Sequence, residues 1–445
     1  MPTDATHDPS LKSWVESAND PQTAFPIQNL PLCSFEQEHD GHSHPHLGVV
    51  IGDRVLDVTT LAMSGKLCGG DEQLARVLHA PLWNIVAGQP GLVRQLRAEI
   101  QDFLRSDRPA SQPIKRLRDK ALVPLAEARL RKPLLSFDYT DFYASKHHAT
   151  TVGSMFRPDN PLLPNYTHVP IGYHGRASSI VPSGTPIRRP SGQTKADDAA
   201  LPAFGPSKML DYEMELGVFI ASGNTLGEPI RIGDVREHML GMCIVNDWSA
   251  RDLQKWEYQP LGPFLAKNFA TSVSPFIVTM EALEPFRIPG PARGEGDPEP
   301  LGYLQTSEPW GLDVAVEVHL ATKQMRDKGM SPMRLSRGSF RDMYWTIAQL
   351  ITHHASNGCN LQTGDLLGSG TISGPTKDAR GCLLELTWEG VGPDGKPKPR
   401  APIQLPTGET RLFLQDGDEV IMNAFCERDG FRRIGFGECR GVIVG

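Results

Sequence analysis

The chain has 445 residues, and its 45 Lys or Arg against 52 Asp or Glu give a formal net charge of −7. This mildly acidic balance argues against a broad nucleic-acid or anionic-membrane footprint, and no run of about 18 apolar residues predicts a membrane span. The polar N-terminus lacks a basic start followed by an apolar segment, so no secretory signal is expected. Seven cysteines without a CxxC pair indicate free thiols and a cytoplasmic protein.

The first part of the chain predicts a small mixed domain. Residues 47–58 read as two strands around a Gly-Asp turn, and residues 71–106 read as helical. A buried helix face is indicated by Leu92, Leu96, Ile100 and Phe103, which recur three or four residues apart. Because 445 residues exceed the usual size of one domain, we place a boundary in the following basic stretch, with domains at 1–130 and 131–445.

After residue 135 the pattern is mainly β with some helix. Strand-like runs alternate with Gly and Pro turns, among them MELGVFIASGN, GLDVAVEVHLAT, CLLELTWEG and EVIMNAFC. One amphipathic helix is predicted within 339–358, with an apolar face of Met343, Ile347, Leu350 and Ile351. Residues 285–310 and 390–408 read as long loops.

The segment LDYEMELGV, residues 210–218, carries three acidic residues at alternate positions. Alternate side chains of a β-strand share a face, so Asp211, Glu213 and Glu215 would lie together. Carboxylates at such short distances repel one another, and burial raises the free energy of ionising them. Two interpretations stay open: the face is exposed to solvent, or it binds a hard cation such as Ca²⁺ or Mg²⁺, which prefers carboxylate oxygens.

The segment DYTDFYASKHHATTVGSMFR contains residues that can face one polar cleft, namely Asp141, Tyr143, His148 and Arg157. A histidine with a pKa near neutral can act as a general base. Each of these residues taken alone is more often a helix cap or a surface residue. The cleft is therefore a hypothesis that depends on the other segments.

A polar stripe is predicted in the segment NDWSARDLQKWEYQP. A helix over 247–258 would place on one face the side chains of Asp247, Arg251, Gln254 and Tyr258. Such stripes commonly face solvent. Lys267 follows in the apolar context PFLAKNFA, where it either reaches to the surface or pairs with an anion.

Two further segments suggest a binding loop and a partner for a histidine. The glycines of GDLLGSGTISG, residues 364–374, indicate a loop that brings backbone close to a ligand. CLLELTW, residues 382–388, reads as a strand with Glu385 inside its apolar run. A glutamate that points inward there needs a partner, and a histidine is the obvious candidate.

In their number and order, these segments resemble the fumarylacetoacetate hydrolase family. The likeness rests on DYTDFY, YHGRASSIV, SGTPIRRP, LDYEMELG, NDWSARD, THHASNGCNL, GDLLGSGTISG and DGDEVI. It implies a small N-terminal SH3-like barrel domain, a larger C-terminal β-roll domain and a homodimer. It also implies cleavage of a carbon–carbon bond of 4-fumarylacetoacetate by water, giving fumarate and acetoacetate, in the last step of tyrosine and phenylalanine catabolism.

The resemblance assigns functions by position. The catalytic positions match His148 as the base, Glu385 as its orienting partner, and Arg251 and Lys267, which with Gln254 would stabilise an oxyanion. The Ca²⁺ ligands match Asp141, Glu213, Glu215 and Asp247, and a Mg²⁺ site would share Asp247 and add Lys267 and Thr271. The substrate contacts match Tyr143, Arg157, Tyr173, Gln254, Tyr258 and Thr371. His147 stands beside His148 and stays an alternative base.

Two features lie outside the assigned site. On a regular strand Asp211 would point to the same face as Glu213, yet the resemblance does not include it among the cation ligands. We therefore expect strand twist or a bulge to turn the Asp211 side chain away from the cation. The stretch EQEHDGHSHPHLG holds His39, His42, His44 and His46 and resembles a soft-metal tract. We expect an exposed loop there.

Two other functions stay open. A related acylpyruvate hydrolase or oxaloacetate decarboxylase would share the carboxylate site, but such relatives are shorter and generally lack the large N-terminal domain. A non-enzymatic, cation-stabilised binding scaffold would account for the acidic strand. It gives no reason for His148, Glu385 and Lys267 to occur together.

Overall fold

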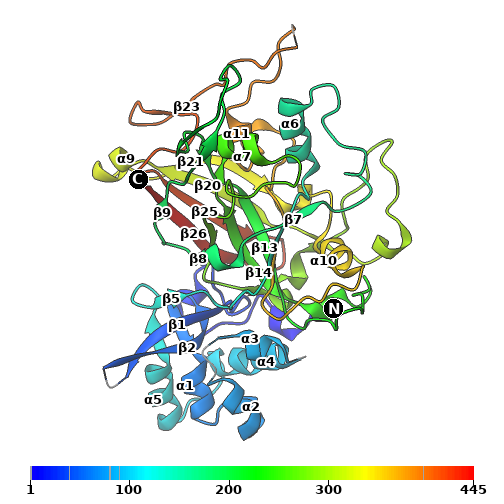
Figure 1. Cartoon of the computed structure of the whole chain (residues 1–445). Helices are drawn as coiled ribbons and strands as arrows, with labels where there is room; N and C mark the ends of the chain where they lie inside the picture. The colour runs from blue at the N-terminus through cyan, green and yellow to red at the C-terminus, as the bar shows by residue number, and fades with distance from the viewer. Residues whose placement is uncertain (1–2, 40, 80–81, 90, 394) are drawn as a thin grey trace.

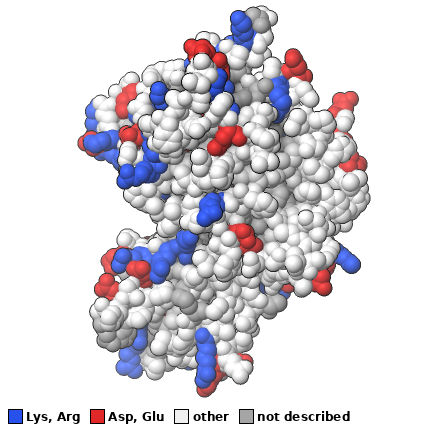
Figure 2. Space-filling model, in the orientation of Figure 1, with Lys and Arg blue, Asp and Glu red and all other residues white. Residues whose placement is uncertain are grey.

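The computed structural model describes residues 3–39, 41–79, 82–89, 91–393 and 395–445. Figure 1 shows a smaller N-terminal part, blue to cyan, below a larger part that runs from green to red. Among the described residues, no helix has both the length and the apolar character of a membrane span. On the face drawn in Figure 2, acidic and basic side chains are interspersed.

The N-terminal part is built on a five-stranded antiparallel sheet in the order β4-β3-β2-β1-β5. Its strands are β1 (Leu32–His39), β2 (His42–Ile51), β3 (Arg54–Asp57), β4 (Leu122–Pro124) and β5 (Arg129–Arg131). The predicted Gly-Asp turn joins β2 to β3, and Gly52 has a φ of 56°, which favours glycine. The helices of this part are α1 (Val58–Met63), α2 (Glu72–Val77), α3 (Asn84–Ala87), α4 (Leu92–Leu104) and α5 (Gln112–Ala121).

Two N-terminal predictions need correction. The helical stretch at 71–106 is three helices, α2 to α4, and Gly91, with a φ of 78°, stands just before α4; positions 80–81 and 90 lie outside the described residues. The described part of the histidine stretch is not a loop, because its residues extend β1 and β2 as far as the pair His39 and His42, while position 40 lies outside the described residues. β5 spans the predicted domain boundary at 130 and pairs with β1.

The larger part is built on two large sheets. The first is eight-stranded, runs in the order β7-β6-β22-β13-β14-β16-β8, and has β17 paired to β14. Its strands are β6 (Tyr139–Phe142), β7 (Gly172–His174), β8 (Ile180–Pro182), β13 (Met214–Ile220), β14 (Met239–Asp247), β16 (Thr271–Val273), β17 (Val278–Thr279) and β22 (Leu366–Gly368). The second sheet has five strands, β9 (Ile187–Arg188), β20 (Ala315–Ala321), β21 (Met333–Ser339), β25 (Glu419–Cys426) and β26 (Ile434–Val444).

Smaller elements complete the fold. Two-stranded pairs are formed by β10 (Ser191–Thr194) with β11 (Ala203–Pro206), β12 (Leu210–Asp211) with β15 (Ser249–Ala250), β18 (Arg287–Ile288) with β19 (Gly311–Leu312), and β23 (Ile403–Gln404) with β24 (Thr410–Arg411). The α-helices are α6 (Lys146–Phe156), α7 (Arg251–Glu257), α8 (Met280–Leu283), α9 (Lys323–Asp327), α10 (Ile347–Ala355) and α11 (Leu383–Leu386). Short 3₁₀ helices lie at Ala5–His7, Glu16–Asn19, Cys68–Gly70, Ala177–Ser179, Val235–His238, Glu284–Phe286, Gly302–Leu304, Phe340–Asp342 and Lys377–Ala379. The predicted mainly β fold with some helix is confirmed.

Three predictions for the larger part were wrong in detail. The stretch 382–388 is not a strand but contains the helix α11, because the Asp211 carboxylate accepts the first helical N–H groups and Leu and Glu favour helix. The helix predicted over 247–258 begins only at Arg251, since Asp247 ends β14 and β15 intervenes. The helix predicted within 339–358 is α10, which leaves Met343 before it.

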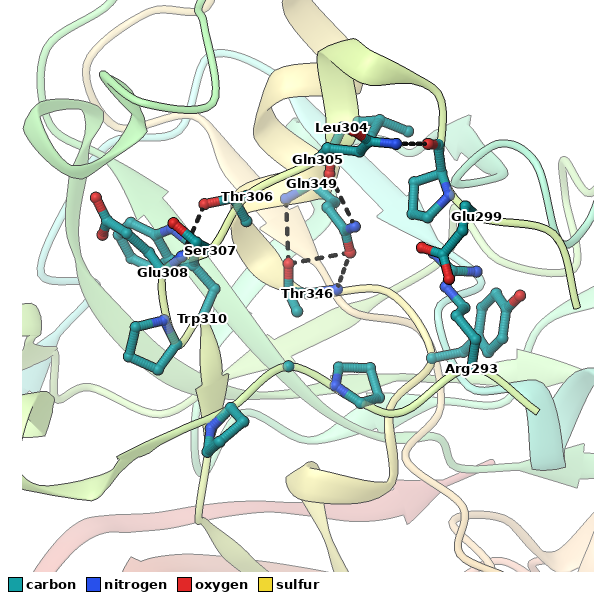
Figure 3. Close-up of a pocket in the computed structure, with 16 residues that line it drawn as sticks. Arg293, Glu299, Leu304, Gln305, Thr306, Ser307, Glu308, Trp310, Thr346 and Gln349 are labelled. Atoms are coloured by element: carbon teal, nitrogen blue, oxygen red, sulfur yellow. Dashed lines mark hydrogen bonds between the residues drawn. The ribbon is translucent and has the colours of Figure 1, made fainter. Parts of the chain in front are cut away.

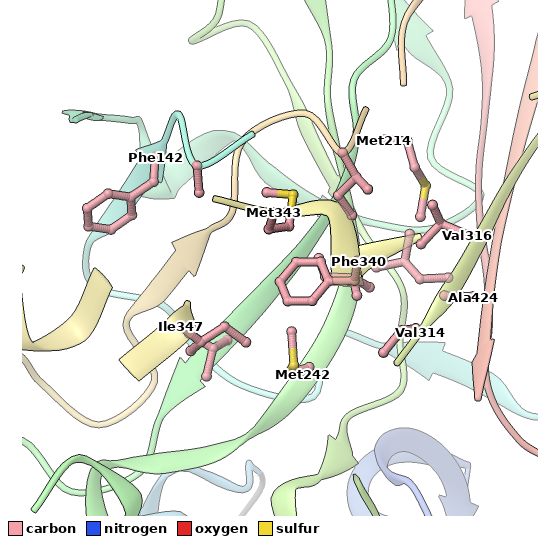
Figure 4. Close-up of a cluster of buried hydrophobic side chains, with 14 of the residues drawn as sticks. Phe142, Met214, Met242, Val314, Val316, Phe340, Met343, Ile347 and Ala424 are labelled. Carbon is pink, nitrogen blue, oxygen red and sulfur yellow. The ribbon is translucent and has the colours of Figure 1, made fainter. Parts of the chain in front are cut away.

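Apolar residues bury the eight-stranded sheet on both faces. Figure 4 shows one face, where Met214, Met242 and Phe340 pack between the two sheets. The other face packs against the N-terminal part, and Phe219 shares a buried cluster with Leu47 and Trp83. A strand covered on both faces reads as an almost continuous apolar run, which is what MELGVFI shows.

Candidate active site and metal centre

Three carboxylates lie on the same face at one end of the eight-stranded sheet, because side chains alternate between the two faces along each strand. On β6, Asp141 lies two residues after Tyr139; on β14, Asp247 lies two residues after Val245. On β13, Glu215 lies four residues before Phe219 and therefore points to the same face. Tyr139, Val245 and Phe219 all belong to the cluster that faces the N-terminal part, so the acidic residues extend that same face.

Glu213 completes a compact cluster of four buried carboxylates. It lies in the break between β12 and β13, and its backbone oxygen accepts a hydrogen bond from the Asp247 N–H at 3.3 Å. Ligand atoms of Asp141, Glu213, Glu215 and Asp247 all lie within 4.8 Å of one another. The four side chains are buried, so solvent does not screen their mutual repulsion.

A glycine leaves the space that the cluster uses. Gly368 on β22 pairs with Asp141 on one side and with Gly217 of β13 on the other. A Cβ atom at this position would lie 2.9 Å from Asp141 Oδ1 and 2.9 Å from Glu215 Oε2. Any larger residue would therefore enter the space between two carboxylates.

Two buried cations offset part of the negative charge. Lys267 donates to Glu213 and, at 2.7 Å, to Asp247, and Arg251 donates to Glu213 Oε1 at 2.7 Å. Although burial opposes ionisation, Lys267 and Arg251 hold the pKa of Glu213 well below its usual range. Within the cluster, Glu213 and Asp247 therefore have a basic partner, whereas Asp141 and Glu215 have none among the described residues. Arg251 also pairs with Asp211, so the two basic side chains do not neutralise the site.

The uncompensated charge falls on Asp141 and Glu215. Burial, together with the neighbouring carboxylates, raises the pKa of both groups well above the usual range. Asp141 Oδ1 and Glu215 Oε1 are buried and have no hydrogen-bond partner among the described residues. Buried carboxylate oxygens without donors are what a hard cation would satisfy, so the residues present fit a divalent ion.

Thr271, Tyr173 and Lys267 lie next to the clustered carboxylates. Thr271 Oγ1 lies 3.2 Å from Asp247 Oδ1, and Tyr173 donates its hydroxyl to Asp247 Oδ2 at 2.7 Å. Carboxylates around Lys267 raise the pKa of its ammonium despite burial. A charged ammonium cannot ligate a cation, so Lys267 would offer a Mg²⁺ ion only its backbone oxygen.

Asp211 is turned away from the cluster, as predicted. The chain leaves strand geometry at Tyr212 and Glu213, between β12 and β13, and this break sends Asp211 toward α11. Its carboxylate accepts from Arg251 Nε at 3.0 Å and from the N–H groups of Leu383 and Leu384. Asp211 therefore supports Arg251 and α11 and lies outside the cluster of four carboxylates.

A buried His–Glu pair lies beside this cluster. His148 stands in the first turn of α6, whose N-terminus is capped by Ser145, and its Nδ1 lies 2.6 Å from Glu385 Oε2. Ser373 donates to the same Glu385 oxygen at 2.7 Å. Burial opposes ionisation of Glu385, but His148 and these hydrogen bonds hold its pKa below the usual range. The structure thus joins Glu385 to His148, with His147 half-buried beside it.

Some of the predicted substrate contacts touch the His–Glu pair or Arg251, and others do not. The Tyr143 ring stands edge-on to the His148 ring with centroids 5.3 Å apart, and Gln254 accepts from Arg251 at 3.1 Å. Thr371 is buried, and its hydroxyl has no hydrogen-bond partner among the described residues. Arg157 donates to the nearby Pro161 carbonyl, and Tyr258 is half-buried at the end of α7.

Some residues of the site were not predicted individually. The glycines of 364–374 indicated a close backbone approach, and Gly370 N–H does donate to Glu215 Oε2 at 3.1 Å. The particular importance of Gly368 follows only from the strand pairing that places it between Asp141 and Glu215. Ser373 gave no signal, since an isolated serine in a glycine-rich loop has many possible functions.

An open cavity lies away from this site. It has a volume of about 770 Å³ and is lined by prolines, Trp310 and polar side chains of the 289–310 segment together with Thr346 and Gln349 (Figure 3). None of the four clustered carboxylates lines it, and neither does His148 or Glu385. We therefore place the candidate active site at the carboxylate cluster and the His–Glu pair, and not at this cavity.

The fold and the site define a class of protein: a mainly β scaffold with four clustered buried carboxylates beside a buried His–Glu pair. Comparison with known families agrees. Residues 28–133 match the family described as "Fumarylacetoacetase N-terminal", and residues 139–444 match "Fumarylacetoacetate (FAA) hydrolase C-terminal". The chain belongs to the fumarylacetoacetase family, so the predicted resemblance is confirmed.

Individual relatives are similar over almost their whole length. The chain is 46% identical to fumarylacetoacetase of Bos taurus over 437 residues, covering 97% of this chain and 98% of the relative. It is 45% identical to fumarylacetoacetase of Homo sapiens with the same coverage. It is 44% identical to fumarylacetoacetase of Arabidopsis thaliana, covering 98% of each chain.

Proposed function

We propose that this protein hydrolyses a carbon–carbon bond of 4-fumarylacetoacetate to give fumarate and acetoacetate, the last step of tyrosine and phenylalanine catabolism. The observation that carries the proposal is the His148–Glu385 pair beside a four-carboxylate cation site. The near full-length similarity to fumarylacetoacetases supports it. Hydrolysis of such a β-diketone acid needs an activated water, an oxyanion site and stabilisation of an enolate.

His148 would activate the water. With Nδ1 hydrogen-bonded to the Glu385 carboxylate, the neutral ring keeps its proton at Nδ1 and presents Nε2 as the basic nitrogen. Glu385 remains ionised because its pKa is lowered, so it can stabilise the imidazolium that forms when the ring takes a proton from water. Tyr143, edge-on to the ring, restricts its rotation.

Arg251, Gln254 and Lys267 would stabilise the oxyanion that forms at the attacked carbonyl. Arg251 is buried, and its Nη2 has no hydrogen-bond partner among the described residues, so this donor remains available. Lys267 is held as an ammonium by two carboxylates. Fixed buried donors of this kind need no reorganisation as charge develops, which makes them effective.

Asp141, Glu213, Glu215 and Asp247 would hold a Ca²⁺ ion, and Asp247 with Thr271 and Lys267 would hold Mg²⁺. A bound divalent cation would accept substrate oxygens and offset the negative charge of the enolate product. Glu213 links the two halves of the site, because it joins the carboxylate cluster to both Arg251 and Lys267. Substrate carboxylates and oxygens would be held by Tyr143, Arg157, Tyr173, Gln254, Tyr258 and Thr371.

We further propose a cytoplasmic homodimer that binds neither nucleic acid nor membrane. All seven cysteines are free, as expected in a reducing compartment. Large apolar side chains are exposed on two adjacent segments, namely Leu201 and Phe204 on one and Trp256, Leu261 and Phe264 on the other. The segments adjoin because Trp256 donates to Gln193, which pairs with Phe204. Such a patch favours burial against a second copy.

The assay supplies fumarylacetoacetate to protein loaded with Ca²⁺ and follows the loss of its ultraviolet absorbance, with fumarate and acetoacetate identified as products. Cleavage of a short acylpyruvate without decay of fumarylacetoacetate would favour the related hydrolase. Absence of cleavage with either compound would favour a binding scaffold.

A separate experiment tests the metal site. The double variant Glu213→Ala with Glu215→Ala should lose the bound cation, measured by elemental analysis, and retained stoichiometric metal would reject the strand site.

A further inference from the structure

A second group of potential metal ligands lies at the His–Glu pair. Ligand atoms of His148, Cys382 and Glu385 lie within 4.8 Å of one another, and all three side chains are buried. The Cys382 thiol donates to Glu385 Oε2 at 3.3 Å, and His148 Nδ1 lies 2.6 Å from the same oxygen. Glu385 Oε1 has no hydrogen-bond partner in the described parts of the chain.

We propose that His148, Cys382 and Glu385 form an inhibitory site for a borderline-soft divalent cation, Zn²⁺, distinct from the carboxylate cluster. The inhibitory part rests on the proposed function, because it assumes that His148 is the base. The binding part rests only on the three ligands. Imidazole, thiolate and carboxylate are the ligand types that Zn²⁺ takes from proteins.

The geometry is close to what Zn²⁺ requires. With Zn–N and Zn–O bonds of about 2.0–2.2 Å and a Zn–S bond of about 2.3 Å, tetrahedral ligand atoms lie roughly 3.3–3.6 Å apart. The sulfur–oxygen distance of 3.3 Å already meets this. The nitrogen–oxygen distance of 2.6 Å must widen by less than about 1 Å, as the cation replaces the hydrogen bond between them.

Charge also balances. On binding, the Cys382 thiol releases its proton to solvent, so thiolate and carboxylate together supply two negative charges to the ion. Arg380 Nη1, 3.7 Å from Glu385 Oε1, opposes a cation, and the new thiolate charge offsets it. The carboxylate cluster contains only oxygen ligands, which suit Ca²⁺ and Mg²⁺, so the two groups differ in the metals that they select.

Binding at this site would switch off the base. Once Nδ1 of His148 coordinates Zn²⁺, the proton of the neutral ring resides on Nε2. That nitrogen then has no lone pair to accept a proton from water. Glu385 is also withdrawn from His148, since its oxygen binds the ion. Zinc would therefore inhibit without displacing the cation of the carboxylate cluster.

The binding test uses Co²⁺ as a spectroscopic substitute for Zn²⁺. Protein kept in excess Ca²⁺ is titrated with Co²⁺ and should develop a near-ultraviolet thiolate-to-cobalt charge-transfer band that Zn²⁺ abolishes. Cys382→Ser should remove the band, and Cys359→Ser, at a half-buried cysteine of another segment, should keep it. Ser retains a hydroxyl that can donate to Glu385, and circular dichroism verifies the fold. No band, or a band that survives in Cys382→Ser, would overturn the proposal.

The activity test follows Zn²⁺ inhibition in excess Ca²⁺, with each variant compared with its own zinc-free rate. Cys382→Ser should need about tenfold more zinc or higher for half-inhibition, because it loses one ligand. Cys359→Ser should match the parent. Equal zinc sensitivity of Cys382→Ser and the parent would refute the inhibitory site. If the protein cleaves no fumarylacetoacetate at all, the cobalt band still decides the binding site, so the two failures are distinguishable.

Discussion

Nδ1 of His148 and Oε2 of Glu385 lie 2.6 Å apart, although 237 residues separate them in the chain. Glu385 reaches His148 from α11, and Ser373 donates to the same oxygen. Glu385→Gln keeps the shape but removes the charge that would stabilise the imidazolium. We expect kcat for fumarylacetoacetate to fall by about 10²–10⁴-fold with little change in KM.

Steady-state kinetics and a thermal unfolding scan measure this outcome together. The unfolding temperature should change little, because Gln can still accept from Ser373. A Glu385→Gln enzyme with the parent kcat would show that Glu385 is structural only.

The two adjacent histidines provide a matched pair of substitutions. His148→Gln should abolish measurable turnover, because of the two histidines it is His148 whose ring is hydrogen-bonded to Glu385. His147→Gln should keep most activity, since His147 is half-buried and lies next to the pair without bonding to Glu385. Both proteins should bind Ca²⁺ as the parent does, measured by calorimetry. Loss of turnover in His147→Gln alone would reverse the assignment of the base.

Much of the fold and site could be predicted, for identifiable reasons. Apolar alternation and turn residues were enough to find the C-terminal half of β2 and the strands β3, β13 and β25, because these segments lie in sheets with well-defined faces. The family motifs placed Asp141, Glu213, Glu215 and Asp247 together before any geometry was known, and the structure brings their oxygens within 4.8 Å.

The errors arose where distant residues decide local structure. The run CLLELTW has strand-like composition, yet the carboxylate of Asp211 accepts N–H groups of Leu383 and Leu384 and thereby supports α11. No local pattern contains that information. The histidine stretch is strand and not loop because β1 and β2 pair as far as His39 and His42. His42, Ser43 and His44 are exposed and polar, so this part of the stretch lacks the apolar alternation that indicates a strand.

Gly368 is expected to be essential for cation binding. In Gly368→Ala the new Cβ would lie 2.9 Å from both Asp141 Oδ1 and Glu215 Oε2, so the carboxylates must separate. Calcium affinity measured by calorimetry should fall at least about tenfold, and the rise of unfolding temperature with Ca²⁺ should shrink accordingly.

Gly205→Ala is the matched control for this substitution. Gly205 lies on β11, and a Cβ there would meet no atom within 4 Å. It should keep the parent's calcium affinity and activity. Unchanged calcium binding in Gly368→Ala would mean that the cation does not lie between these carboxylates.

Asp211 is expected to stabilise the fold without binding the cation. Its buried carboxylate accepts from Arg251 Nε at 3.0 Å and from the N–H groups of Leu383 and Leu384 at 2.8 and 2.9 Å. Asp211→Asn would leave the Arg251 charge with one partner fewer in a buried setting, which should cost about 3–5 kcal/mol of unfolding free energy. Arg251 is one of the proposed oxyanion donors, so kcat should fall as well.

The control for Asp211→Asn is an ion pair of similar geometry whose carboxylate, that of Asp416, is exposed. Asp416 accepts from Arg189 Nε at 2.7 Å, but its side chain is 52% exposed, so Asp416→Asn should cost at most about 1 kcal/mol. Chemical denaturation in the presence of Ca²⁺ compares the two variants, and elemental analysis measures their metal. Asp211→Asn should retain one calcium per chain, because the four carboxylates of the cluster are intact. If it instead loses the ion while its stability is unchanged, then Asp211 is a ligand and the break at Tyr212 and Glu213 does not separate it from the metal.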